Sequence, residues 1–390
     1  ISVTTKGPSN KISGGLEFET SSLFDDYNYN LLGFNLSGPL LKKVNADGTK
    51  GNSLIGYFLS GELRNVDDKD PSAIGMWKVK DDVLKDLREN PFVLSPNATA
   101  GFLSSSEFLR ESDFELVDAK LNTNEKRINI SGKLDFKPSK NTFLSLGGSF
   151  YAKKSNDFSH WRSMFSWDEN RNSSQTTYRL FGKLTQKFGT EESNSDESAS
   201  TIKNAFFTIQ GDYTSNKYTY SDETHGDNLF HYGYIGKFHT TKAPFYESGS
   251  VVDSSTGIVY NGQVLGGWAD TLYTFEASDI NANLANYTSS YFSMFEEYGQ
   301  NSFQAGTMND YFGIDASNDG VIRTAADLKG QGLRNGQGTL WQENNVYSLF
   351  ANHASWYGYS VKEENTQLSF KASGSADVKS HEFSFGFEFE

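Results

Sequence analysis

The sequence lacks several features that define common classes of protein. It contains no cysteine, so no disulfide framework is available and the redox compartment stays undecided. No segment approaches the ~20 consecutive apolar residues that a membrane-spanning helix needs. Acidic residues (49) outnumber basic ones (35), and the resulting net charge of -14 argues against nucleic acid as a partner.

Aromatic residues are abundant, with 31 Phe and 20 Tyr in 390 residues. A hydrophobic content of 36% with negative mean hydropathy would ordinarily indicate a soluble protein of two or three domains. A transmembrane β-barrel can have a similarly low mean hydropathy, because its strands need an apolar residue only at every second position over ~9–11 residues. The composition therefore leaves both classes open.

Alternation of apolar with polar residues is the dominant pattern in the chain. The C-terminal segment shows it most clearly, since Phe383, Phe385, Phe387 and Phe389 alternate with Ser384, Gly386, Glu388 and Glu390. This pattern is typical of a strand with two different faces. It predicts about eleven strands, near residues 16–18, 32–36, 55–63, 128–136, 144–152, 178–188, 205–213, 230–238, 262–276, 368–372 and 383–389.

The connections between these segments alternate in length. Short or modest ones lie near 39–52, 137–141, 189–202 and 376–380, and long ones at 65–125, 153–175 and 277–358, whereas 241–261 fits the alternation less well. Outer-membrane barrels have short periplasmic turns and long external loops in this order. Two long loops also carry helical patterns, one capped by Asp279 and ending at Gly299, the other running from Val79 to Leu87 before Pro91.

The N-terminal segments resemble one family of membrane proteins. Val3-Thr4-Thr5-Lys6-Gly7 resembles the last plug strand of TonB-dependent outer-membrane transporters. The segments 14–19 (GGLEFE) and 29–39 (YNLLGFNLSGP) resemble the opening hairpin of the SusC/Oar-like members from Bacteroidota. The resemblance implies the end of a plug and a linker at 1–10, and the N-terminal half of a transmembrane antiparallel barrel at 11–390, about eleven of 22 strands.

That resemblance also implies a function and partners. The expected function is active import of a large nutrient, such as a glycan, peptide or chelate, across the outer membrane of a Gram-negative bacterium. The expected partners are a TonB-type energy-transducing complex, outer-membrane lipid and a SusD-like surface lipoprotein. An eleven-stranded open sheet would leave unpaired edges in hydrocarbon, so we expect a longer polypeptide that supplies the plug and the closing strands.

No catalytic signature is present, and the sequence predicts a protein that is not an enzyme. One segment resembles the first half of an EF-hand-type calcium loop, with ligands expected from Asp315, Ser317, Asp319 and the carbonyl of Val321. Position twelve of that pattern is Ala326 and not the usual Glu, so an Asx-rich turn is the alternative. Calcium is thus the one cofactor that the sequence suggests.

Aromatic residues near one loop form a candidate substrate-binding group. Trp161, Phe165 and Trp167 suit stacking on sugar or peptide ligands at a barrel mouth. The alternative is a structural role in an interfacial girdle or in loop packing. Two other functions also stay open for the whole chain, a passive porin or adhesin barrel and a soluble secreted all-β binding protein.

Overall fold

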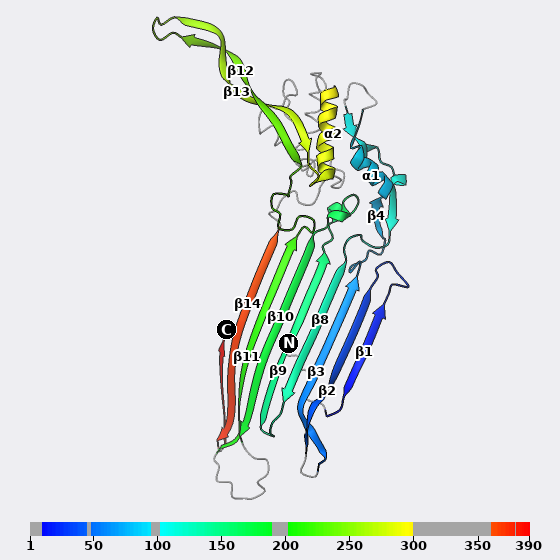
Figure 1. Cartoon of the computed structure of the whole chain (residues 1–390), viewed down its shortest axis with the longest axis vertical. Coiled ribbons are helices and arrows are strands. Elements are labelled where there is room, and N and C mark those ends of the chain that lie inside the picture. The colour runs from blue at the N-terminus through cyan, green and yellow to red at the C-terminus, as the bar shows by residue number, and fades with distance from the viewer. Residues whose placement is uncertain (1–9, 45–47, 95–101, 189–201, 299–359, 379) are drawn as a thin grey trace.

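The computed structural model is mainly β-strand, built around one large antiparallel sheet (Figure 1). It describes residues 10–44, 48–94, 102–188, 202–298, 360–378 and 380–390. The sheet has nine strands in the order β1-β2-β3-β8-β9-β10-β11-β14-β15. They are β1 (Ser13–Thr20), β2 (Asn30–Val44), β3 (Lys50–Val66), β8 (Glu125–Phe136), β9 (Thr142–Asn156), β10 (Asn172–Phe188), β11 (Ile202–Ser221), β14 (Val361–Val378) and β15 (His381–Phe389).

The register gives this sheet one apolar face and one polar face. Residues directly opposite each other in antiparallel strands share a face. From β2 to β14, one such row reads Leu36, Leu59, Gly132, Gly148, Leu180, Tyr213 and Leu368. The adjacent row, displaced by one residue, reads Asn35, Ser60, Ser131, Ser149, Arg179, Thr214 and Gln367. The predicted alternation therefore holds across the whole sheet.

The apolar face is exposed and has no covering layer among the described residues. Its large side chains have the high accessibilities that a soluble core residue never shows. Phe385 is 68% exposed, for example. The exposed members of this face include Leu16, Phe18, Leu36, Leu59, Leu63, Ile128, Ile130, Leu134, Leu146, Phe150, Leu180, Phe188, Ile209, Tyr213, Leu368, Phe370, Phe383, Phe385, Phe387 and Phe389.

The polar face carries charged side chains in pairs together with a few aromatic rings. Lys133 lies 3.0 Å from Asp135, and Arg179 lies 2.7 Å from Asp212. Phe181 lies on the same face, where Gly147 leaves room for its ring; a Cβ at Gly147 would sit 2.8 Å from that ring. This face is thus polar with local apolar contacts, and it differs sharply from its opposite.

The connections at the two ends of the sheet differ in length, as predicted. At one end, strands are joined by residues 45–49, 137–141, 189–201 and 379–380. At the other end they are joined by 21–29, 67–124, 157–171 and 222–360. The helices and the small additional strands all lie at this second end, which we call the loop end (Figure 1).

Two predicted strands do not belong to the sheet. The strand predicted at 230–238 is wrong for its first residues, because residues 222–234 form successive hydrogen-bonded turns, including His231 N to Asn228 O (2.9 Å), and only 236–238 are strand, at the start of β12 (Gly236–Val252). The segment 262–276 is a strand, β13 (Val259–Ala277), but it pairs only with β12 (Gly236–Val252) in a separate hairpin. Local alternation cannot identify a strand's partner, and here it matched a turn segment whose Phe230 is 94% exposed.

This correction explains the one connection that did not fit the length pattern. The segment 241–261 contains most of β12, the tip of the β12–β13 hairpin and the first residues of β13, all within the long connection 222–360. Asp253 shapes that tip by accepting hydrogen bonds from the backbone and hydroxyl of Ser255, which lower the pKa of its carboxyl group to about 2. The hairpin extends away from the sheet at the loop end (Figure 1).

Both predicted helices are present, but each begins later than predicted, since Val79 is the last residue of a strand (Met76–Val79) and Asp279 lies two residues before the residue that precedes the second helix. The shorter, α1 (Asp81–Glu89), has Asp81 and Asp82 in its first turn and Arg88 in its last, which complements the helix dipole. The longer, α2 (Ala282–Tyr298), begins after Asn281, whose carbonyl accepts the hydrogen bond from Ala285 N (2.9 Å). Neither helix, within the described ranges, has the length and apolarity needed to cross a membrane.

Short elements complete the loop end. They are β4 (Met76–Val79), β5 (Phe92–Leu94), β6 (Phe102–Ser104), β7 (Phe114–Val117) and the 3-10 turns η1 (Ser105–Phe108), η2 (Glu111–Asp113), η3 (His160–Arg162) and η4 (Trp167–Glu169). β4 pairs with β7, and β5 pairs with β6. The connection 67–124 is therefore a folded unit with α1 between two small hairpin-like pairs.

A glycine substitution tests the register of the sheet. A Cβ at Gly148 would lie 2.5 Å from the carbonyl oxygen of Arg179 and 2.9 Å from Leu180 Cδ2, so Gly148→Ala should lower the free energy of unfolding by about 1–3 kcal/mol. The matched control is Gly211→Ala in β11, where nothing lies within 4 Å of the added Cβ. Urea unfolding followed by tryptophan fluorescence measures both. Equal stability of the two variants would contradict the β9–β10 register.

Candidate ligand-binding loops

The loop end has its own hydrophobic core, formed by two connections. Val79, Leu84, Leu87 and Phe165 are buried together. Partly buried side chains surround them, namely Val83, Leu109, Phe114, Met164 and Trp167. Met164, Phe165 and Trp167 come from the connection 157–171, and the other members come from 67–124, so this core joins the two connections into one body.

Polar contacts reinforce the junction between these connections. Val79 N donates to Met164 O (3.0 Å). The Arg88 guanidinium lies 3.2 Å from both carboxylate oxygens of Asp168, through two different nitrogens. This bidentate arrangement is the strongest geometry for such a pair. It fixes the last turn of α1 against η4.

The predicted aromatic group has a structural place in this core. Phe165 is fully buried and packs edge-on against Phe114, with ring centroids 5.9 Å apart. Trp167 is partly buried, and the Lys78 ammonium lies 4.9 Å from its ring centroid. Phe165 thus has no free ring face for a ligand in this structure. The backbone of Trp161 lies in η3, and its side chain is outside the described part of the structure.

Lys78 connects this core to the surface. Burial alone lowers the pKa of its ammonium group, but hydrogen bonds to Asp81 and Glu115, each 2.7 Å away, outweigh that effect and raise the pKa above its ordinary value. The lysine therefore stays charged throughout the physiological range. Its charge holds α1 and β7 together beneath the Trp167 ring.

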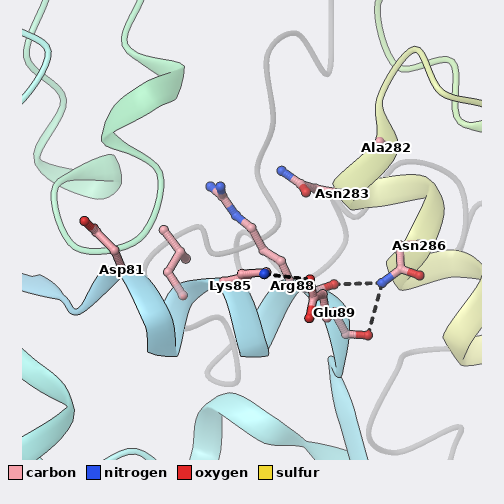
Figure 2. Close-up of a pocket in the computed structure, with 8 residues that line it drawn as sticks. Asp81, Lys85, Arg88, Glu89, Ala282, Asn283 and Asn286 are labelled. Carbon is pink, nitrogen blue, oxygen red and sulfur yellow. Dashed lines mark hydrogen bonds and ion pairs between the residues drawn. The ribbon is translucent and has the colours of Figure 1, made fainter.

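A cleft of about 420 Å³ lies between α1 and α2 (Figure 2). Its lining residues are Asp81, Leu84, Lys85, Arg88, Glu89, Ala282, Asn283 and Asn286. Asn286 Nδ2 donates to the carbonyls of Arg88 (2.7 Å) and Glu89 (3.3 Å), which are at the end of α1, where carbonyls lack a partner within the helix. The side chains of Arg88, Asn283 and Asn286 face the gap between the helices in Figure 2. The cleft offers charged and amide groups, a suitable set for a small polar ligand.

The cleft brings a third connection into the loop body. Phe92 stacks at a tilt on Tyr287 of α2, with centroids 5.0 Å apart. Tyr287 is buried, and this burial raises the pKa of its phenol. The connections 67–124 and 222–360 therefore pack on each other through both apolar and polar contacts. The sequence predicted the two helices but gave no indication that they meet.

A second cleft, of about 590 Å³, lies where the connection 67–124 returns to the sheet. Residues 116–124 line it together with Asp26 and Asp67. Its walls are both polar and apolar. A further cleft of about 560 Å³ lies beside α1, so the loop end has several concave surfaces.

The predicted calcium ligands Asp315, Ser317, Asp319 and Val321 fall outside the described residues. Within the described ranges, no group of three or more His, Asp and Glu side chains is placed to hold a metal ion. Calcium at 315–321 stays a prediction.

No protein-family model, no curated protein and no solved structure matches the chain.

Truncation of Phe165 tests the loop core. Phe165→Ala removes a fully buried ring and should destabilise the loop body by about 3–5 kcal/mol. We expect faster cleavage within 67–124 by a broad-specificity protease, read by mass spectrometry. Phe230→Ala, which removes a 94% exposed ring at the same end of the molecule, is the control and should leave cleavage unchanged. Unchanged cleavage of both variants would show that Phe165 does not hold the loops together.

Proposed function

We propose that this chain forms part of the barrel of a TonB-dependent importer in the outer membrane of a Gram-negative bacterium. In this proposal the apolar face contacts lipid, the polar face lines the lumen, and the loop end captures a large nutrient outside the cell. The observation that carries the proposal is the exposed apolar face of the nine-stranded sheet. An exposed apolar patch on a soluble monomer rarely exceeds ~300–600 Å².

The apolar face has the height of a bilayer core. In β10 it runs from Tyr178 to Phe188. Ten residue steps at ~3.3 Å give about 33 Å along the strand, and a strand tilt of ~40° reduces this to about 25 Å across a membrane. That is the height of the apolar band on outer-membrane barrels.

Both borders of the apolar face carry aromatic pairs. Tyr178 and Tyr213 lie toward the loop end, with ring centroids 6.1 Å apart. Phe188 and Phe207 lie toward the short-turn end, with centroids 5.7 Å apart. Aromatic girdles at the two interfaces are typical of transmembrane barrels. The pairs support the same placement as the height of the band.

Among the described residues, the ion pairs of the lipid-facing side lie beyond the tyrosine border. Lys217 pairs with Glu364 (2.9 Å), and Lys154 pairs with Glu223 (2.6 Å). Both pairs lie toward the loop end, past the last large apolar side chains of their strands. Charge in hydrocarbon is costly, whereas charge at the headgroup level is not.

The edges of the sheet favour a closed barrel with further strands. Among the described residues, β1 and β15 each pair on one side only. An unpaired strand edge in lipid leaves backbone groups without partners at a cost of several kcal/mol each. We infer that additional strands of the polypeptide pair with both edges, and that a plug occupies the lumen.

Single cysteines test the membrane placement, since the chain has none of its own. Spin labels at Leu146 or Phe150 should collide with lipid-soluble oxygen, because these side chains lie on the apolar face. Labels at Ser145 or Ser149, on the opposite face, should collide with a water-soluble nickel complex instead. Electron paramagnetic resonance on the full polypeptide in liposomes reads both. Equal nickel access at all four sites would favour the soluble secreted all-β alternative.

Coupling to the inner membrane separates the importer from a passive barrel. We expect the full polypeptide, crosslinked in cells, to co-purify with a TonB-type protein, since the resemblance at 3–7 implies a plug and its motor. A general porin from the same membrane is the control. A lipid-embedded barrel that captures no more TonB-type protein than the porin does would favour the passive porin or adhesin alternative. A SusD-like lipoprotein in the same eluate would add the proposed surface partner.

A further inference from the structure

Four cations surround one buried carboxylate on the polar face, close to the loop end. Glu125, the first residue of β8, has a side chain that is only 2% exposed. Arg64 forms an ion pair with Glu125 Oε1, and Arg127 Nη2 lies 2.8 Å from the same oxygen. Lys153 and Lys69 approach Glu125 Oε2 at 3.4 Å and 3.8 Å. We call these five residues the cationic cluster.

The strand register places these cations together. Arg64 lies directly opposite Arg127, and Arg127 lies directly opposite Lys153, so three like charges cross β3, β8 and β9 in one row. Like charges directly opposite in a sheet destabilise it. A single carboxylate offsets only part of this repulsion.

The cluster has a surplus of positive charge. Four cations and one carboxylate leave a net charge of +3, and every ion pair described for these four cations goes to Glu125. The neighbouring acids are engaged elsewhere: Asp67 accepts from Asn28, and Asp68 accepts from the backbone of Asp70 and Lys120. Glu62, two residues before Arg64 on the same face, is the one further carboxylate along that strand.

The other ion pairs described for the polar face have a different composition. Lys133 pairs with Asp135, Arg179 with Asp212 and Lys371 with Glu388, so each of these pairs joins one cation to one carboxylate. The chain as a whole carries -14. The positive charge of the cluster is therefore opposite in sign to the net charge of the chain.

The cluster also has more hydrogen-bond donors than Glu125 can accept. Each arginine carries five N–H donors and each lysine three, whereas a carboxylate has two acceptor oxygens. The four cationic side chains are 23–35% exposed, with Arg64 at 23% and Lys69 at 35%, so part of each remains open on the polar face. Open guanidinium and ammonium groups around one point favour a second anion.

We infer that the cationic cluster binds an anionic oxygen group, namely a carboxylate, phosphate or sulfate, within the lumen. The inference rests on the proposed function, in which the polar face is the lumenal surface that a nutrient meets after the loops. The group belongs either to an acidic nutrient or to another segment of the same polypeptide. The two guanidinium groups supply planar forks for its oxygens, and the two ammonium groups supply additional charge.

Inorganic phosphate is the probe, titrated calorimetrically into the purified full polypeptide at low ionic strength. Arg127→Gln and Lys153→Gln should each weaken binding by about tenfold, because each removes a charge-assisted hydrogen bond. Glu125→Gln should strengthen binding, because it removes the competing carboxylate. Lys154→Gln, next to Lys153 but on the opposite face and paired with Glu223, is the matched control and should bind like the wild type.

A second measurement identifies the source of the anion. If a carboxylate of the polypeptide occupies the cluster, a zero-length carbodiimide should crosslink Lys69 or Lys153 to an acidic residue other than Glu125, and free phosphate should bind weakly. If the site is open for a nutrient, phosphate should bind saturably with no such crosslink. Absence of both phosphate binding and crosslink in a folded protein would overturn the inference.

These outcomes are separable from the test of the proposed function. Spin labels that report lipid at Leu146 with no anion at the cluster would refute the anion site alone. Anion binding with labels that report water on both faces would refute the membrane placement alone. Protease resistance of each variant, compared with Lys154→Gln, confirms that lost binding does not reflect an unfolded protein.

Discussion

The period of two residues along a strand is the constraint on which this structure depends. A slip of one residue between any two strands would exchange the apolar and polar faces of every residue beyond it. The rows from Leu36 to Leu368 and from Asn35 to Gln367 keep the same face across seven strands without a slip. Small residues help to hold this register, since at Gly148 the neighbouring backbone leaves no room for a side chain.

The two faces place their charges differently, and desolvation explains why. On the polar face, ion pairs such as Arg179–Asp212 occur beside the middle of the strands. On the apolar face, the ion pairs among the described residues, such as Lys217–Glu364, lie toward the loop end. Moving a charge out of water costs several kcal/mol even when it is paired. The middle of the apolar face therefore holds none of the described ion pairs, whereas the middle of the polar face holds some of them.

The sequence was sufficient to predict all nine strands of the large sheet and both helices, because these depend on local periodicity. It was insufficient where partners matter. The alternation at Phe230, Tyr232 and Tyr234 has the same period as a strand, yet hydrogen-bonded turns there place Phe230 in solvent. Likewise, nothing in the pattern around Val259–Ala277 indicates that it pairs outside the main sheet.

For the candidate sites as well, the sequence identified residues but not their neighbours in space. Phe165 and Trp167 were identified as a group because they lie in one connection, but only the structure shows that Phe165 lies in a core with residues of α1. The cationic cluster was missed because the predicted strands began at Ile128 and ended near Leu63 and Ala152. Each prediction stopped one residue short of the cation at the strand end. With the strand order known, the opposed positions of Arg64, Arg127 and Lys153 follow from the register alone.

The position of the cluster at the base of the connection 67–124 is itself determined by contacts. A parallel bridge joins Asp68 to Thr123, and Thr123 Oγ1 donates to Asp67 O (3.0 Å), so the two ends of the connection 67–124 are tied together. This closure brings Lys69, at the start of the connection, beside Glu125, which follows its end. The loop body and the polar face therefore share residues at one junction. A change in the arrangement of the loops would move Lys69 relative to the carboxylate, whereas Arg64, Arg127 and Lys153 would stay fixed by the sheet.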